Sequence, residues 1–95
     1  TENGSSYDDV KVNGEVLDVK RTDYLVAHLQ SLQSAITEGA PVKGYFAWSL
    51  LDNFEWAEGY AKRFGIVYVD YQSFERTPKM SFEKYKEIIK ANTAI

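Results

Sequence analysis

Two tryptophans and a glutamate have side chains and a spacing that could bind a sugar. Trp48 lies near the end of an apolar run, and Glu55 and Trp56 follow in a stretch of mixed aromatic and charged residues. A flat indole face suits the C–H surface of a pyranose ring, and a carboxylate can accept hydrogen bonds from two hydroxyl groups. Because the apolar run predicts a strand and the residues after it a loop, the three side chains can converge at the strand's carboxyl end.

Any catalysis by this chain must rest on carboxylates. The 95 residues include no Cys and one His, which excludes a thiolate nucleophile, a disulfide framework and a Cys-based or His-rich metal site. The histidine, His28, lies beside the apolar stripe of a predicted helix and is interpreted as a packing residue. We therefore expect neither a metal nor another cofactor.

Charge and hydropathy exclude two classes of partner. The 11 Lys and Arg and the 14 Asp and Glu give a net charge of −3 and alternate without blocks, which leaves no electrostatic footprint for nucleic acid or an anionic membrane. No apolar run approaches the roughly 18 to 20 residues of a membrane span, and the polar first residues are unlike a signal peptide. We expect a soluble, cytoplasmic protein without a nucleic-acid or membrane partner.

The length allows at most one small domain. The chain opens on a turn-forming cluster, residues 1–4, with no preceding strand or helix to turn from. We therefore expect it to be a piece of something longer. The density of turn formers up to residue 20 predicts a surface loop with no core element, in which Asp8, Asp9, Glu15 and Asp18 serve solvation and capping, although the first two could bind a cation weakly.

The first predicted helix covers about residues 18 to 38. Its apolar residues recur at helical spacing on one face: Leu25, Leu29, Leu32 and Ile36. Asp18 is predicted to cap its N-terminus, and Gly39 followed by Pro41 is predicted to end it.

A strand, a loop, a hairpin and a second helix are predicted to follow. Residues 42–51 have the unbroken apolar pattern of a strand buried on both faces, and residues 52–65 are interpreted as a long functional loop. Residues 66–71 and 76–79 predict a small hairpin. Ser81 is predicted to cap the last helix, whose apolar face comprises Phe82, Tyr85, Ile88 and Ile89.

Several segments carry recognisable motifs: 1–4 (TENG), 21–29 (RTDYLVAHL), 44–56 (GYFAWSLLDNFEW), 59–60 (GY), 63–65 (RFG) and 69–70 (VD). In order and spacing they resemble the C-terminal quarter of family 1 β-glycosidases (β-glucosidases). The resemblance covers essentially the whole chain. It implies an α/β fold, the last quarter of a (β/α)8 TIM barrel: the end of strand 7, helix 7, strand 8, a hairpin and helix 8. The missing N-terminal part of the barrel would be an obligate partner, so residues 1–95 would not be an independent domain.

The resemblance also implies a retaining β-glycosidase that acts through a covalent glycosyl-enzyme intermediate on a β-glucoside or related small sugar. Glu2 matches the family's nucleophile. The general acid/base of the family comes from an Asn-Glu-Pro motif, which this sequence does not contain. By the same resemblance Trp48 is the platform at the glycone subsite, Glu55 the acceptor for two sugar hydroxyls, and Trp56 an indole N–H donor and wall. Phe64 is expected to line the pocket or to serve packing alone.

One position bears on the substrate. Related 6-phospho-β-glycosidases usually carry Ser where this chain has Glu55, because a carboxylate repels a phosphate. Glu55 therefore favours an unphosphorylated sugar. Lys62 lies near the position that grips the phosphate in those relatives and is interpreted as a surface lysine.

Two other interpretations remain open. The chain could be a non-catalytic fragment of a split or chimeric barrel, which needs the same partner. It could also be a small carbohydrate-binding module that uses Trp48 and Trp56 as stacking platforms, which would require a closed core of its own. The pairs Tyr45/Phe46 and Tyr68/Tyr71 are interpreted as barrel and hairpin packing.

Overall fold

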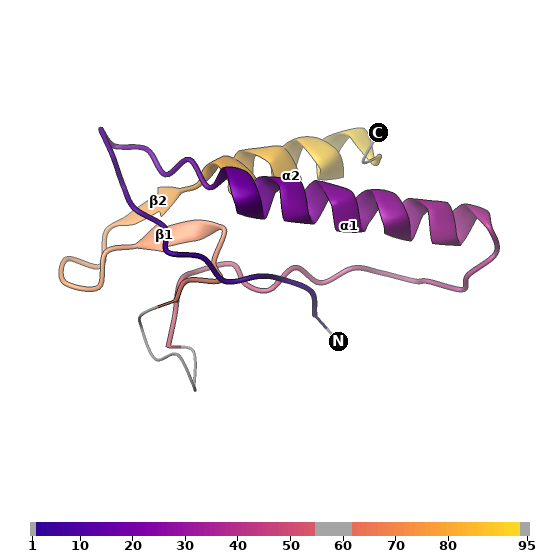
Figure 1. Cartoon of the computed structure of the whole chain (residues 1–95), viewed down its shortest axis with the longest axis horizontal. Helices are drawn as coiled ribbons and strands as arrows, with labels where there is room; N and C mark the ends of the chain where they lie inside the picture. Colours follow the sequence, from indigo (N-terminus) through magenta and orange to yellow (C-terminus); the bar gives the residue numbers. More distant parts are fainter. Residues whose placement is uncertain (1, 55–61, 94–95) are drawn as a thin grey trace.

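The computed structural model describes residues 2–54 and 62–93. Two helices, α1 (Val19–Thr37) and α2 (Met80–Ala91), and two short strands, β1 (Val67–Val69) and β2 (Arg76–Pro78), make up its regular structure. The helices lie side by side, and two extended segments, the N-terminal residues and residues 40–51, run along the other side of α1 (Figure 1). Neither described helix is long and apolar enough to cross a membrane.

Helix α1 confirms the predicted helix to within a residue at each end. Leu25 is buried and contributes to the core, whereas Ile36, at the end of the apolar stripe, is exposed. Gly39 adopts a φ of 103°, and its N–H donates to the Ile36 carbonyl at 3.0 Å. This is the expected left-handed stop, a conformation that favours glycine.

The N-cap position predicted for α1 is confirmed, but the predicted side-chain bond there and the predicted N-cap of α2 are wrong. Asp18 stands at the N-cap of α1, but its carboxylate accepts no capping hydrogen bond from a main-chain N–H of that helix. Helix α2 begins at Met80 with Lys79 at its N-cap, so Ser81 lies inside its first turn. There the Ser81 N–H donates to Asp18 Oδ1 at 2.9 Å and the Ser81 hydroxyl donates to Asp18 Oδ2 at 2.5 Å. Asp18 therefore caps the other helix, 63 residues away in sequence.

The hairpin is confirmed. Strands β1 and β2 pair antiparallel, with Tyr68 opposite Thr77. In the turn, the Asp70 carboxylate accepts hydrogen bonds from the N–H groups of Gln72 and Ser73 at 2.9 and 3.2 Å. These two bonds lower the pKa of Asp70 because they favour the charged carboxylate.

Residues 42–51 are extended, and among the described residues they pair with neighbours only through isolated parallel bridges, Asn3 with Ala47 and Leu51 with Val67. Successive side chains alternate. Tyr45, Ala47 and Leu51 pack against the core of Leu25, Ile66 and Val67. Phe46, Trp48 and Leu50 are 71%, 43% and 61% exposed. The prediction of a strand buried on both faces is thus wrong for this chain, because helices cover one face and nothing described covers the other.

The first 18 residues form a loop, as predicted, but parts of this loop are buried. Val16 belongs to the buried apolar residues, and the side chains of Asp9 and Asp18 are 3% and 1% exposed. The solvation role predicted for these two aspartates is therefore wrong. Asp8, by contrast, is exposed and pairs with the surface Lys62 at 3.1 Å.

Candidate active site

Residues 2–4 lie against the extended segment that contains Trp48. The Asn3 N–H donates to the Phe46 carbonyl at 2.9 Å, and the Asn3 carbonyl accepts from the Trp48 N–H at 2.8 Å. A Cβ added to Gly4 would lie 2.0 Å from the Trp48 carbonyl oxygen. Only glycine permits this approach, so the Glu2-Asn3-Gly4 sequence and Trp48 are locked together through their main chains.

The alternation of side chains decides which way Glu2 faces. Asn3 directs its amide toward the helix side, where it bonds the hydroxyl groups of Tyr24, in α1, and Tyr45. Because neighbouring side chains of an extended chain point to opposite faces, Glu2 lies on the other face. That is the face of Phe46 and Trp48, and Glu2 is itself exposed. The chain thus presents a carboxylate and an indole on one open surface.

Phe64 is brought to the same region by main-chain bonds. The Ser49 N–H donates to the Phe64 carbonyl at 3.1 Å, and the Ile66 N–H donates to the Ser49 carbonyl at 2.9 Å. The peptide bond between Trp48 and Ser49 is cis. Phe64 is half-buried. Three of the five predicted site residues therefore lie on segments that main-chain hydrogen bonds join: Glu2, Trp48 and Phe64.

The other two predicted site residues, Glu55 and Trp56, lie outside the described residues. Asp52, which no sequence pattern indicated, holds the chain on either side of residues 55–61. The Asp52 carboxylate accepts from the Gly65 N–H at 3.0 Å, from Arg63 Nη1 at 2.8 Å and from Lys79 Nζ at 2.8 Å.

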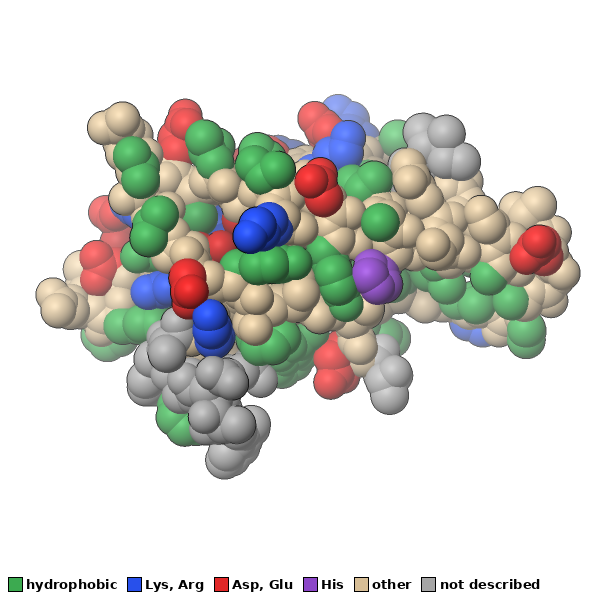
Figure 2. All heavy atoms as spheres, viewed as in Figure 1, with side chains coloured by type: hydrophobic (Ala, Val, Ile, Leu, Met, Phe, Trp, Pro, Cys, Tyr) green, Lys and Arg blue, Asp and Glu red, His purple; other side chains and the backbone are tan. Residues whose placement is uncertain are grey.

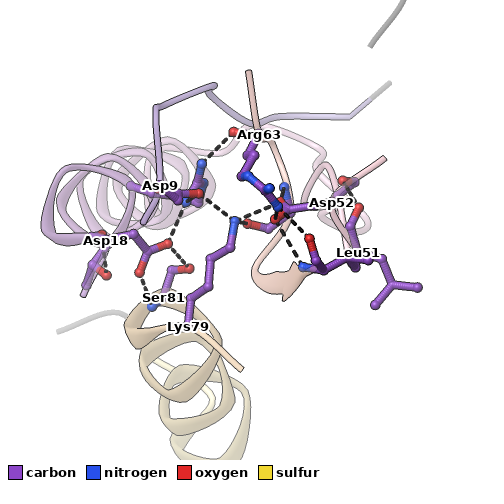
Figure 3. A network of polar contacts seen from close by, with 12 residues as sticks. Asp9, Asp18, Leu51, Asp52, Arg63, Lys79 and Ser81 are labelled. Carbon is purple, nitrogen blue, oxygen red and sulfur yellow. Dashed lines mark hydrogen bonds and ion pairs between the residues drawn. The ribbon is translucent and has the colours of Figure 1, made fainter. Parts of the chain in front are cut away.

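Asp52 belongs to a buried network of three acidic and three basic side chains (Figure 3). At its centre Lys79, fully buried, donates to Asp9, Asp52 and the Gly65 carbonyl at 2.5, 2.8 and 2.6 Å. Arg21 pairs with Asp9 at 2.8 Å and with Asp18 at 2.6 Å. The charges balance, so each buried acid lies against at least one cation.

No sequence signal identified this network, because its partners are up to 70 residues apart. The only local hint is the spacing of Asp18 and Arg21, which is that of a helical ion pair.

The aromatic side chains around the site also have specific polar contacts. Arg63 lies over the rings of Tyr68 and Tyr71, at 4.2 and 4.4 Å from their centroids. Burial opposes the charge of Arg63, but the hydrogen bond and charge of Asp52 outweigh it and raise the pKa of Arg63. Burial, followed by the nearby Tyr85 and Tyr24, raises the pKa of Tyr45 to about 12. Tyr45 is thus a stable hydroxyl donor to Asn3.

The arrangement can bind a ring and attack it with a carboxylate. An exposed indole offers a flat apolar face, and a carboxylate on the same face can serve as a nucleophile. Within residues 2–54 and 62–93, no three His, Cys, Asp or Glu side chains are grouped in a way that could hold a metal ion.

Comparison with known proteins extends this description. The model of glycosyl hydrolase family 1 matches residues 1–94. The chain is 58% identical over 93 residues to β-glucosidase A of Thermotoga maritima, which covers 97% of this chain and 21% of that protein. It is 52% identical over 99 residues to a bifunctional β-D-glucosidase/β-D-fucosidase of Bifidobacterium breve, covering 99% of this chain and 22% of that protein.

Solved structures give the same result. The chain superimposes with a TM-score of 0.95 on a family 1 β-glucosidase of Thermotoga maritima in complex with isofagomine lactam, at 57% identity over 98% of this chain and 21% of that chain. The match to the same enzyme with deoxynojirimycin is equally close. These neighbours are TIM-barrel β-glucosidases, and this chain spans about a fifth of their length. The family model matches residues 1–94, and β-glucosidase A of Thermotoga maritima is 58% identical over 97% of this chain. The chain therefore belongs to glycosyl hydrolase family 1.

Proposed function

We propose that this chain is the C-terminal quarter of a retaining β-glucosidase, containing the end of barrel strand 7, helix 7 (α1), strand 8 (residues 42–51), the hairpin and helix 8 (α2). The observation that carries the proposal is the main-chain pairing of Asn3 with residues 46–48, which puts Glu2 and Trp48 on one face. In a TIM barrel, catalytic side chains come from the carboxyl ends of neighbouring strands, which fits this placement.

In the proposed reaction a Glu2 carboxylate oxygen attacks the anomeric carbon. The bond from that carbon to the leaving oxygen breaks, and a general acid from the remaining part of the barrel donates a proton to the leaving oxygen. The same group then deprotonates a water molecule, which attacks the anomeric carbon, and Glu2 is released as a carboxylate. Retention of configuration requires the two carboxyl groups to lie about 5 to 5.5 Å apart.

The other site residues hold the sugar. Trp48 stacks on the glycone, and Phe64, held beside it by the bond to Ser49, lines the pocket. Glu55 accepts two hydroxyl hydrogen bonds, and Trp56 adds an indole N–H and a wall. Support for these two roles is the resemblance of the 44–56 motif to the family.

Glu2→Gln tests the nucleophile. The variant is placed in a full barrel, which we call the exchanged barrel, made by substituting this chain for the matching segment of the Thermotoga maritima β-glucosidase A. The amide keeps the shape but is no longer a nucleophile, so binding of deoxynojirimycin should persist while kcat for an aryl β-glucoside falls by at least about a thousandfold. Retention of more than about a hundredth of kcat would refute the assignment.

Glu55→Ala tests the preference for unphosphorylated sugar. Because the change strands two sugar hydroxyls in a desolvated pocket, transition-state binding of a β-glucoside should weaken by about 3 kcal/mol or more. The corresponding 6-phosphoglucoside should lose less or gain. Lys62→Met is the matched control and should leave kcat/KM for both substrates unchanged, since Lys62 pairs with the exposed Asp8. A parent barrel that prefers the phosphorylated substrate would contradict the proposal.

The carbohydrate-binding module is the weaker alternative, because it needs a closed core. The buried apolar core consists of few residues, and the Phe46, Trp48 and Leu50 face is open. A non-catalytic split barrel would share the partner but would leave the exchanged barrel inactive even with Glu2 intact.

A further inference from the structure

We propose that Asn3, Tyr24 and Tyr45 form a positioning set that fixes the direction in which Glu2 is presented to the sugar. The proposal rests on the assignment of Glu2 as the nucleophile. It adds three residues on the opposite, helix-facing side of the segment, none of which touches the substrate.

Asn3 is bonded through all of its polar parts. Its main-chain N–H and carbonyl bond Phe46 and Trp48 at 2.9 and 2.8 Å. On its side chain, Nδ2 donates to the Tyr24 hydroxyl at 3.1 Å, and Oδ1 accepts from the Tyr45 hydroxyl at 2.8 Å. An amide with one donor bond and one acceptor bond to different partners has a single orientation, so Asn3 cannot rotate without losing both.

The two tyrosines are themselves held from different elements. Tyr24 lies in α1, and its ring stacks on His28 with centroids 3.9 Å apart. Tyr45 lies in the extended segment that contains Trp48, and its ring packs edge-on against Tyr85 of α2, with centroids 6.2 Å apart. The Asn3 side chain is thus bonded both to helix α1, through Tyr24, and to the extended segment of residues 42–51, through Tyr45.

The geometry has a direct consequence for Glu2. Asn3 and Glu2 share a peptide unit, and their side chains point to opposite faces of the chain. A twist of the main chain at Asn3 that moves its amide away from the tyrosines therefore also moves the Glu2 carboxylate away from the face on which Trp48 lies. A displacement of about 1 Å at a reacting group can cost about a hundredfold in rate.

The test measures formation of the covalent intermediate alone. The exchanged barrel is mixed with 2,4-dinitrophenyl 2-deoxy-2-fluoro-β-D-glucoside. A Glu2 oxygen bonds to the anomeric carbon, the bond to the aryl oxygen breaks, and the electron pair leaves with dinitrophenolate, which needs no proton. The electron-withdrawing fluorine slows the hydrolysis that follows. Absorbance gives the first-order rate constant, the half-saturating concentration and the burst amplitude, and mass spectrometry identifies the labelled residue.

Tyr24→Phe and Tyr45→Phe each remove one hydroxyl, and Asn3→Leu removes the amide while keeping its approximate size. Each tyrosine variant should lower the first-order rate constant about threefold to tenfold. The double variant Tyr24→Phe/Tyr45→Phe and the variant Asn3→Leu should each lower it about tenfold to a hundredfold. The half-saturating concentration should stay within about threefold, because these residues do not bind the sugar. A loss of folded protein would appear in the burst amplitude and leave the rate constant unaltered.

Tyr85→Phe is the matched control, because it removes a hydroxyl from the ring that packs on Tyr45 but not one that bonds Asn3. Its rate constant should stay within about twofold. Labelling of Glu2 in the parent with unchanged rate constants in the Asn3 and tyrosine variants would overturn the positioning proposal alone, as would an equal loss in Tyr85→Phe. A parent that is not labelled at Glu2 would overturn the proposed function itself.

Discussion

Glu2 and Asn3 are adjacent in the chain, yet the tasks proposed for them lie on opposite faces. The motif of residues 1–4 indicated Glu2 directly, because a motif is local in sequence. The partners of Asn3 at positions 24 and 45 carry no local signal and became visible only in the folded chain. Sequence therefore predicted the residue proposed to react but not the residues that hold it in place.

Gly4→Ala should destabilise the exchanged barrel, because the new Cβ would lie 2.0 Å from the Trp48 carbonyl oxygen. The main chain of Trp48 cannot move aside as a flexible side chain can. We therefore expect the variant to lower the free energy of unfolding by about 1 to 3 kcal/mol. Urea unfolding measures it. Gly44→Ala is the control, since a Cβ there meets nothing within 4 Å, and it should be neutral or slightly stabilising. Equal stability of the two variants would contradict this account of Gly4.

Tyr45 should make stability depend on alkaline pH. The pKa of Tyr45 in the folded chain, about 12, lies above the ordinary tyrosine value of about 10, so the folded state favours the protonated phenol. The Tyr45 contribution is thus complete below about pH 10 and is lost as pH rises from about 10 to about 12. Urea unfolding between about pH 9 and pH 11 should show a steeper decline for the exchanged barrel than for its Tyr45→Phe variant. Parallel declines would show that Tyr45 does not titrate in this way.

At the scale of elements, long-range charges rather than local caps join the parts. Helix α1 was predictable because its apolar residues repeat locally, and the hairpin because its turn is local. The start of α2 was not, because its capping carboxylate is Asp18, at the other end of the sequence. The role of Asp52 was not predictable either, because its partners are distant in sequence. Its bonds to Arg63, Gly65 and Lys79 join residues on both sides of positions 55–61.

Lys79→Met should be among the most destabilising single changes. It leaves Asp9 and Asp52 buried with one cation fewer, and breaking a buried pair in this way costs about 3 to 5 kcal/mol. Chemical unfolding of the exchanged barrel measures the loss. Lys84→Met is the control, because Lys84 pairs with Glu87 on the surface at 3.7 Å, and it should cost less than about 0.5 kcal/mol.

The double variant Lys79→Met/Asp9→Asn tests whether the loss comes from uncompensated charge. Removing one acid together with the cation restores part of the balance, so the double variant should be more stable than the sum of the two single losses predicts, by about 0.5 to 3 kcal/mol. Strict additivity would mean that the two side chains do not interact.

The whole molecule is more open than a complete domain of its mass. Its accessible surface is 6556 Å², whereas a compact monomer of 10.9 kDa exposes about 5,600 Å². Its radius of gyration is 14.1 Å, against about 12.4 Å for a compact chain of this length. Apolar side chains are visible on the surface along the length of the molecule (Figure 2). Sequence patterns predicted both helices and the hairpin, but they could not say which side chains of residues 42–51 find a neighbour within this chain.

Exposed apolar side chains gather in two places on the chain. Phe46 is 71% exposed on the open face that also carries Trp48, and Leu50 is 61% exposed. A separate hollow of about 470 Å³ lies between residues 50 and 66 and helix α2. Its lining comprises Leu50, Ile66, Phe82, Tyr85 and Ile89, with Lys86 and Lys90. Each large apolar side chain gains about 1.5 to 3 kcal/mol when buried. A handful of them is therefore comparable with the whole stability of a small domain, about 5 to 15 kcal/mol.

This balance predicts that the 95 residues do not fold alone and gain activity only with the rest of the barrel. Purified by itself, the chain should show weak amide-exchange protection, no cooperative unfolding transition and no β-glucosidase activity. Addition of the remaining part of the Thermotoga maritima β-glucosidase A should restore protection first in α1 and in residues 45–52, which pack on the few buried residues, and should restore activity with it. The Glu2→Gln chain is the control, because it should restore protection without activity. A monomeric, protected and cooperatively unfolding chain without the partner would overturn the prediction and favour the binding module, since only a closed core could hold those apolar faces away from water.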